Sequence, residues 1–149
     1  MASTTIYSVK TALLTKLKAD STLSALQVTY GDPGGAARRE HVFVGDVTAV
    51  DQDPEALASG RRRRVESYRL DVIVSVQSKP QGVQENEERA IALATAVENV
   101  VADYPTLSDT VSGLMFIECS GMSVTSTEAG ADGPLSIITV HFTVKARLS

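Results

Sequence analysis

The chain has 149 residues, of which 43% are hydrophobic and 21% are charged, and its formal net charge is −4. This length and composition predict one globular domain, and the acidic balance disfavours tight nucleic-acid binding, which depends on basic side chains that neutralise phosphates. No run approaches the roughly 18 consecutive apolar residues of a membrane helix, and the single cysteine permits no internal disulfide and fits a reducing cytoplasm.

The first third of the chain predicts one amphipathic helix and two short strands. Over residues 4–19, apolar side chains recur every three or four positions, and a serine or threonine at 3–5 can cap the helix start. Residues 27–30 and 41–45 are predicted strands. The Gly-Asp-Pro-Gly-Gly sequence at 31–35 lacks the Gly-Lys-Ser/Thr ending of a phosphate loop, so we interpret it as a plain turn.

Residues 46–60 contain four acidic side chains and no basic one, which predicts an exposed arm rather than a packed element. The next predicted strand begins with four arginines at positions 61–64 and continues to residue 77. Its apolar side chains occupy alternate positions, a pattern typical of a strand with one buried and one solvated face. They are Tyr68, Leu70, Val72, Val74 and Val76.

Residues 84–103 predict a second and stronger amphipathic helix, whose apolar stripe includes Ile91 and which ends before Pro105. Glutamates near its start complement the helix dipole. They are Glu85, Glu87 and Glu88.

The last third predicts a hairpin of two long strands, at 114–127 and 135–148, joined by a turn rich in glycine. In the first of these strands the apolar positions change parity after Cys119. A β-bulge near Ser120 and Gly121 would return them to one buried face, on which Cys119 is then predicted to belong to the core. The five side chains assigned to that face are Met115, Ile117, Cys119, Met122 and Val124.

Together these elements predict an α+β fold with a mainly antiparallel sheet, two amphipathic helices packed on one of its faces, and the order αβββαββ. The apolar faces are one-sided, which argues against a doubly wound parallel sheet. We expect a single domain over residues 1–149, with an extended arm or loop at about 46–64.

No group of side chains predicts catalysis, a cofactor or a metal. The two histidines, His41 and His141, cannot form a three-histidine site, and no Cys-x-x-Cys or His-x-x-x-His pair is present to begin a zinc site. We expect His141 to be a solvated or interface residue, because a catalytic base needs an oriented partner. The chain is therefore expected not to be an enzyme.

Arg61, Arg62, Arg63 and Arg64 form the one unusual charge cluster. Three interpretations remain open: a solvated strand entry balanced by the acidic arm, a salt-bridge cluster between subunits, or a contact with DNA. If the arginines belong to an interface, we expect three acidic residues of the arm to belong to it as well: Asp51, Asp53 and Glu55.

Over its whole length the chain resembles the tail terminator, or tail-completion, proteins of long-tailed bacteriophages. The resemblance rests on a small acidic chain whose N-terminal amphipathic helix leads to a short strand ending in Val-Thr-Tyr-Gly at 28–31. It continues with a loop-separated pair of strands, a Glu-rich helix after the strand that ends near Val76, and a closing hairpin.

The resemblance implies a hexameric ring of copies of the chain, located at the head-proximal end of the tail in the virion and assembled in the host cytoplasm. Such a ring stops polymerisation of the tail tube, contacts the tail tube protein and the head–tail connector or stopper protein, and lets DNA pass without binding it specifically.

A lumen lined by all four arginines would hold DNA rather than release it. We therefore expect the arginines to face a neighbouring copy or a tail protein, and we expect residues 46–60 to become ordered on assembly. The alternatives are a head-completion or neck connector adaptor, a tail tube subunit, and a small α+β binding module or enzyme.

Overall fold

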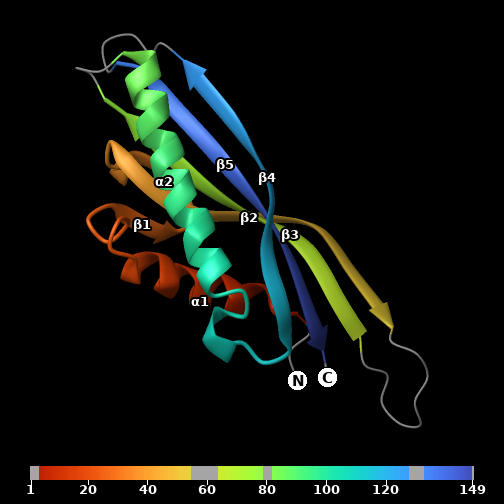
Figure 1. The fold of residues 1–149 in the computed structure, drawn as a ribbon. Coiled ribbons are helices and arrows are strands. Elements are labelled where there is room, and N and C mark those ends of the chain that lie inside the picture. Colours follow the sequence, from red (N-terminus) through yellow and green to blue (C-terminus); the bar gives the residue numbers. More distant parts are fainter. Residues whose placement is uncertain (1–3, 55–63, 79–81, 128–132, 149) are drawn as a thin grey trace.

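The computed structural model describes residues 4–54, 64–78, 82–127 and 133–148. These residues form one five-stranded sheet in the order β1-β2-β3-β5-β4, in which every neighbouring pair is antiparallel except the parallel pair β1 and β2 (Figure 1). The predicted α+β class and the order αβββαββ are confirmed. The elements are α1 (Ile6–Ala19), β1 (Gln27–Tyr30), η1 (Gly34–Ala36), β2 (Glu40–Pro54), β3 (Arg64–Gln77), α2 (Val83–Asp103), η2 (Leu107–Asp109), β4 (Leu114–Thr127) and β5 (Leu135–Leu148).

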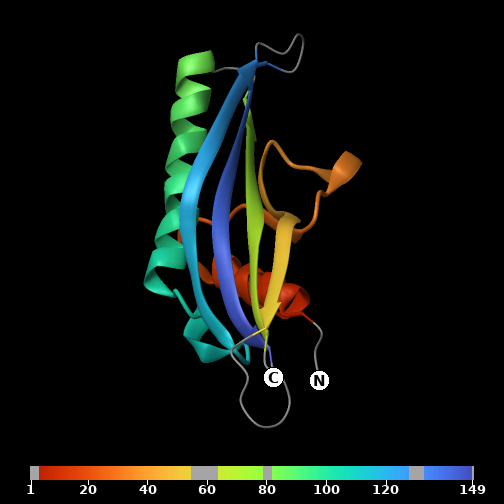
Figure 2. The same ribbon diagram turned by 90° about the vertical axis from the view of Figure 1, so that its right-hand side faces the viewer.

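One face of the sheet is covered by the helices, and Figure 2 shows α2 lying along the sheet, while none of the described helices covers the opposite face of β3 and β5. We call that opposite side the open face. The covered face and the helices share one core, because the buried side chains of β3 and β5 belong to the same cluster as Leu13 of α1 and Val97 of α2. None of the described helices is long and apolar enough to cross a membrane.

The alternation predicted for β3 is confirmed, since all five of its predicted apolar side chains are at most 3% exposed. β5 alternates in the same way, and α2 buries most of its predicted stripe. Two positions of the apolar stripe are exposed: Tyr104, directly after the helix, at 42%, and Ile91 at 41%. Ile91 lies at the border of the buried face of α2, on the side of the helix that also carries Glu87 and Glu98.

β2 is longer than the sequence predicts. The predicted strand ends at residue 45, but residues 46–54 continue it and pair with β3, with register shifts between Val44 and Val47 and between Thr48 and Asp51. Because of these shifts, the apolar residues of β2 do not alternate regularly with polar ones. The acidic side chains are also exposed, so this part of the sequence looks like a loop. The expected arm is therefore a paired strand up to Pro54, while residues 55–63 lie outside the described part of the chain.

β4 contains the predicted bulge, which appears as a register shift between Cys119 and Gly121, and also a second shift between Leu114 and Phe116. Because of the second shift, Leu114 packs against the core while Met115 is 39% exposed. The placement of Cys119 in the core is wrong, since the residue is exposed. β4 is the outermost strand, so among the five side chains assigned to its buried face only Ile117 is buried.

The start of α1 is held by Glu66 of β3 rather than by a local cap. The carboxylate of Glu66 accepts hydrogen bonds from the Thr5 backbone N–H at 2.9 Å, from the Thr5 hydroxyl at 2.8 Å and from the Thr4 hydroxyl. Of the predicted caps, Ser3 lies outside the described residues, and Thr4 accepts the Ile6 N–H through its side-chain oxygen at 3.2 Å. Glu66 is fully buried; burial raises its pKa, but hydrogen bonds from Thr4, Thr5 and Gln52 outweigh burial, so the pKa lies below its ordinary value of 4.5.

Candidate interaction surfaces

The residues that sequence analysis assigned to an interface are only partly brought together. Arg64 begins β3 and donates from Nη1 to the Gln52 side-chain oxygen at 2.9 Å, so it contacts its own chain. Asp51 and Asp53 lie opposite Ser67 and Val65 in the ladder and are exposed. Among the described residues the ion pairs are those of Arg69, Arg89 and His141, and none joins Arg64 to either aspartate. Glu55, Arg61, Arg62 and Arg63 lie outside the described residues.

The sheet ends in two different edges. β4 is outermost on one side over its whole length, Leu114–Thr127. On the other side β1 pairs only with residues 41–44 of β2, so no described strand flanks residues 46–54. Exposed strand edges present unpaired backbone N–H and C=O groups, and these groups can bind a strand of another chain.

A chain of polar contacts crosses three strands on the open face. His141 of β5 lies with Nδ1 2.6 Å from Asp71 Oδ1 of β3, and with Nε2 3.1 Å from Ser123 Oγ of β4. Arg69 Nε donates to the same carboxylate oxygen at 3.2 Å. His141 therefore has an oriented acidic partner, which the sequence did not indicate.

The connectivity of Ser123, His141 and Asp71 is that of a hydrolase triad, in which an acid orients a base and the base activates a hydroxyl. A triad also needs donors that converge on the developing oxyanion. Ser123 and Val124 continue the regular ladder with β5, and successive N–H groups of a strand point to opposite sides in the plane of the sheet. These groups do not converge above the hydroxyl, so the contacts chiefly tie β3, β5 and β4 together.

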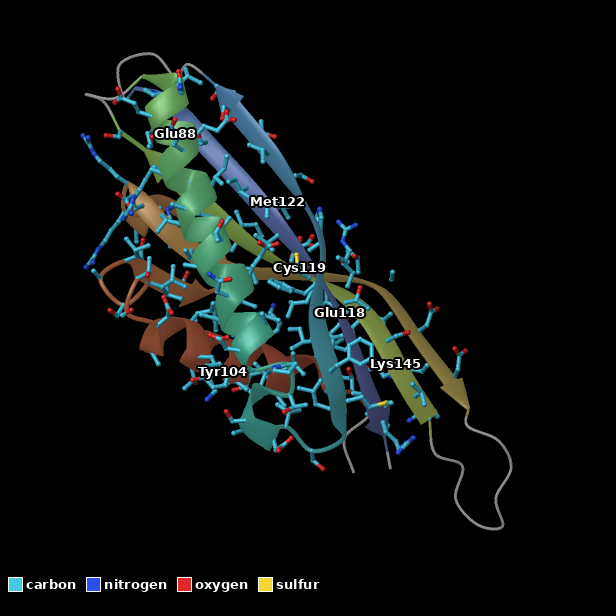
Figure 3. The ribbon with its side chains drawn as sticks, viewed as in Figure 1. Glu88, Tyr104, Glu118, Cys119, Met122 and Lys145 are labelled. Atoms are coloured by element: carbon cyan, nitrogen blue, oxygen red, sulfur yellow. The ribbon has the colours of Figure 1, made fainter. Side chains whose placement is uncertain are left out.

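A cleft of about 380 Å³ lies between the C-terminal half of α2 and β4. Its lining is mainly apolar and includes Val101, Ala102 and Ile117, with Glu98 and Cys119 at its side. Three exposed apolar residues continue along α2 and β4: Ile91, Met122 and Val124 are 41%, 38% and 44% exposed. Figure 3 shows Cys119 and Met122 along β4, with Glu88 and Tyr104 towards the two ends of α2.

The thiol of Cys119 donates to Glu98 Oε1 at 3.0 Å. Partial burial raises the pKa of this thiol, and the hydrogen bond to Glu98 and the charge of that carboxylate raise it further. Cys119 is therefore a poorly ionised thiol, which argues against a nucleophilic role.

An aromatic and basic surface lies at the opposite edge of the sheet, on α1 and β1. The rings of Tyr7 and Tyr30 are 6.1 Å apart, and Lys10 Nζ lies 4.4 Å from the centre of the Tyr30 ring. Tyr7 is 70% exposed, the largest value among the exposed hydrophobic residues described. Lys16, on the other flank of α1, stacks on Tyr104 at 4.1 Å.

Among the described residues, no group of three or more His, Cys, Asp or Glu side chains is placed to hold a metal ion. The sequence did not reveal the contacts that join Ser123, His141 and Asp71, which are up to 70 residues apart and have no shared spacing signal. The exposed apolar residues of β4 were recognised as apolar but were assigned to the core. Knowing that β4 is an edge strand would have indicated that these residues are exposed, but this depends on the strand order, which the sequence pattern does not give.

No protein-family model matches the chain, and no curated protein matches its sequence. Among solved structures, the chain is similar to one from the virion of a native gene transfer agent particle, with 16% identity and a TM-score of 0.48 over 98% of this chain and 99% of that one.

Proposed function

We propose that the chain is a structural protein of a bacteriophage-like virion and that it acts as a tail terminator, a ring that caps the tail tube and joins it to the head connector. The resemblance of the element order supports the class of protein. The observation that carries the ring is the pair of different edges on opposite sides of one sheet, namely β4 and residues 46–54 of β2.

Two different edges on each copy favour a head-to-tail contact, which closes into a ring when the rotation between copies allows it. The strand directions agree with such a contact. β2 and β5 run the same way, because both are antiparallel to β3, and β4 runs opposite to them. A copy related by rotation about an axis along the strands therefore offers β4 as an antiparallel neighbour of β2.

The remaining partners follow from this role. One side of the ring contacts the tail tube protein and the other contacts the head–tail connector protein, while DNA passes through the lumen. The acidic chain suits this passage because it supplies few phosphate contacts. We retain the assignment of Arg61, Arg62, Arg63 and Arg64, with Asp51, Asp53 and Glu55, to a contact with a neighbouring copy or a tail protein.

Imaging of particles assembled without the protein tests the function directly. We expect tail tubes of uncontrolled length that fail to join heads, and rings in purified protein by electron microscopy and native mass measurement. Tails of normal length would contradict the terminator role. Normal tails that fail to join heads would instead indicate the head-completion or neck adaptor role.

A double charge reversal tests the arginine assignment. Arg62→Glu with Arg63→Glu should prevent ring formation or tail joining while the circular dichroism spectrum of the monomer stays unchanged. Unchanged assembly of this variant would remove the arginines from the interface.

A hydrolase is the second candidate, because Ser123, His141 and Asp71 have triad connectivity. A fluorophosphonate probe tests it. We expect no labelling that depends on Ser123, since the strand supplies no converging N–H donors. Labelling that Ser123→Ala and His141→Ala both abolish would favour the hydrolase.

A further inference from the structure

We propose that neighbouring copies in the ring join through two surfaces that lie at opposite edges of each sheet, an acidic cleft on one copy and a basic surface on the next. We use the name acidic cleft for a surface along α2 and β4 that includes Glu98 and Cys119 of the cleft and continues beyond it to Glu87, Ile91, Met122 and Val124. The basic surface comprises Tyr7, Lys10, Lys18 and Tyr30, on α1 and β1. This inference rests on the proposed ring and names the contact that closes it.

The two surfaces are complementary in charge. α2 contains five acidic residues and one basic residue, and β4 adds a further glutamate and no basic residue. The basic residue is Arg89, which pairs with Glu40 at 3.0 Å on the flank away from β4. α1 contains three lysines and no acidic residue, and β1 contains no charged residue. Opposite charges steer copies together and disfavour contacts between like surfaces.

The acidic cleft also has the apolar anchors of an interface. Ile91 of α2 and Met122 and Val124 of β4, on the same two elements that border the cleft, leave between 38% and 44% of their surface exposed. Exposed apolar groups that gather beside a cleft mark an interaction site, and methionine and tyrosine are enriched in interface cores. Tyr7 and Tyr30 supply two adjacent rings on the basic surface, with ring centres 6.1 Å apart. A tyrosine of one copy can thus pack on the methionine and valine of the next.

The two surfaces lie at the same height along the strands. Residues that pair across the sheet form rows perpendicular to the strands. One row begins with Tyr30 of β1, which pairs with Val44, and continues through Val72 and Val140 to Met122 of β4. The next row begins at Val28 and ends at Val124 in the same way. Both rows point to the helix-covered side. Copies related by rotation without a shift along the strands therefore bring the surfaces together, which is the condition for a closed ring rather than a helical filament.

Two charge-reversal variants test the contact. The cleft variant carries Glu87→Lys and Glu98→Lys, and the surface variant carries Lys10→Glu and Lys18→Glu. Each variant alone should lose the ring species in native mass measurement, because every contact would then join like charges. Matched controls reverse charges on the other flanks of the same helices, with Glu85→Lys on α2 and Lys16→Glu on α1, and should form rings as the natural chain does. Thermal unfolding confirms that all variants are folded.

Mixing the two variants gives the decisive result. The reversed cleft of one variant meets the reversed surface of the other, and the two unaltered surfaces also match, so rings should return with the two chains in equal number. Rings that form from either variant alone would overturn the proposed contact while leaving the ring function intact. A mixture that does not restore rings would also overturn it. Variants that form rings but fail to cap tail tubes would show that the cleft binds a tail protein instead of a second copy, and would overturn it too. A natural chain that never forms rings and is not needed for tail length would remove the proposed function itself.

Discussion

Asn86, which is fully buried near the start of α2, donates its side-chain amide to the Val76 carbonyl of β3 at 2.9 Å. The second amide hydrogen is directed to Ser136 Oγ of β5, also at 2.9 Å. A single side chain therefore connects the helix to both central strands, while its oxygen has no partner among the described residues.

Replacing Asn86 by alanine should lower the free energy of unfolding by about 1–3 kcal/mol, because the Val76 carbonyl is then buried without its donor. Urea denaturation followed by circular dichroism measures the change. The control Asn99→Ala alters an exposed residue of the same helix and should stay within about 0.5 kcal/mol of the natural chain. Equal stability of both variants would contradict the structural role of Asn86.

Glu66→Gln should reduce stability at neutral pH by about 2–4 kcal/mol, since three charge-assisted hydrogen bonds at the start of α1 are weakened. The folded pKa of Glu66 lies below its ordinary value of 4.5. The charged carboxylate thus stabilises the fold above that pH, and the stabilisation disappears as the pH falls through the folded pKa. The natural chain should accordingly lose its advantage over the variant below pH 4.5, whereas Glu88→Gln, an exposed control, should follow the natural profile.

Gly113→Ala should destabilise the protein by about 2–4 kcal/mol, because the position has a left-handed backbone and the new methyl group collides with the Arg147 carbonyl. Its φ is +83°, and the same glycine accepts the Arg147 N–H at 2.7 Å. The matched control is Gly35→Ala, where an added methyl group meets open space. Thermal unfolding of the two variants compares them, and a tolerated Gly113→Ala would contradict this backbone arrangement.

Cys119 should react with a disulfide reagent more slowly than an ordinary exposed thiol at pH 8, because its pKa is raised. Glu98→Gln removes the charge next to the sulfur and should increase the rate by about three- to tenfold, with the pH profile shifted to lower pH. The thiol is still partly buried in the variant, so its pKa should remain higher than that of a free thiol. An unchanged profile would show that Glu98 does not act on the thiol.

The fold was predictable because most of its signals are local. The apolar alternation of β3 and β5 and the stripe of α2 each follow from the sequence, and even the bulge after Cys119 could be placed from the change of parity. The errors arose where the strand order matters. The side chains of β4 have the pattern of a buried face, yet most are exposed because β4 is the outermost of the described strands and α2 covers it only in part.

Less of the candidate surfaces was predictable. The contact between Asp71 and His141 depends on β3 and β5 being neighbours in register, and no spacing in the sequence indicates this. Likewise, the length of β2 could not be inferred, because two register shifts remove its alternation and β3 supplies the hydrogen bonds that hold it. The opposite charges of α1 and α2 were visible in the sequence, but their places on one face of the sheet, α1 towards the β1 edge and α2 towards the β4 edge, were not.

The two register shifts divide β2 into a part beside the core and an outer part whose pairing with β3 is irregular. The body under the helices is locked, since sliding α2 by one turn would replace Asn86 with Ala90 and lose both amide bonds. The outer half of β2 is joined to β3 by its ladder and by the Gln52 side chain, which bonds to Glu66 and Arg64, and its bulged pairing bends and twists the strand. In the proposed ring, bending at the second shift, between Thr48 and Asp51, would let the outer end of β2 adjust to the orientation of a neighbouring copy.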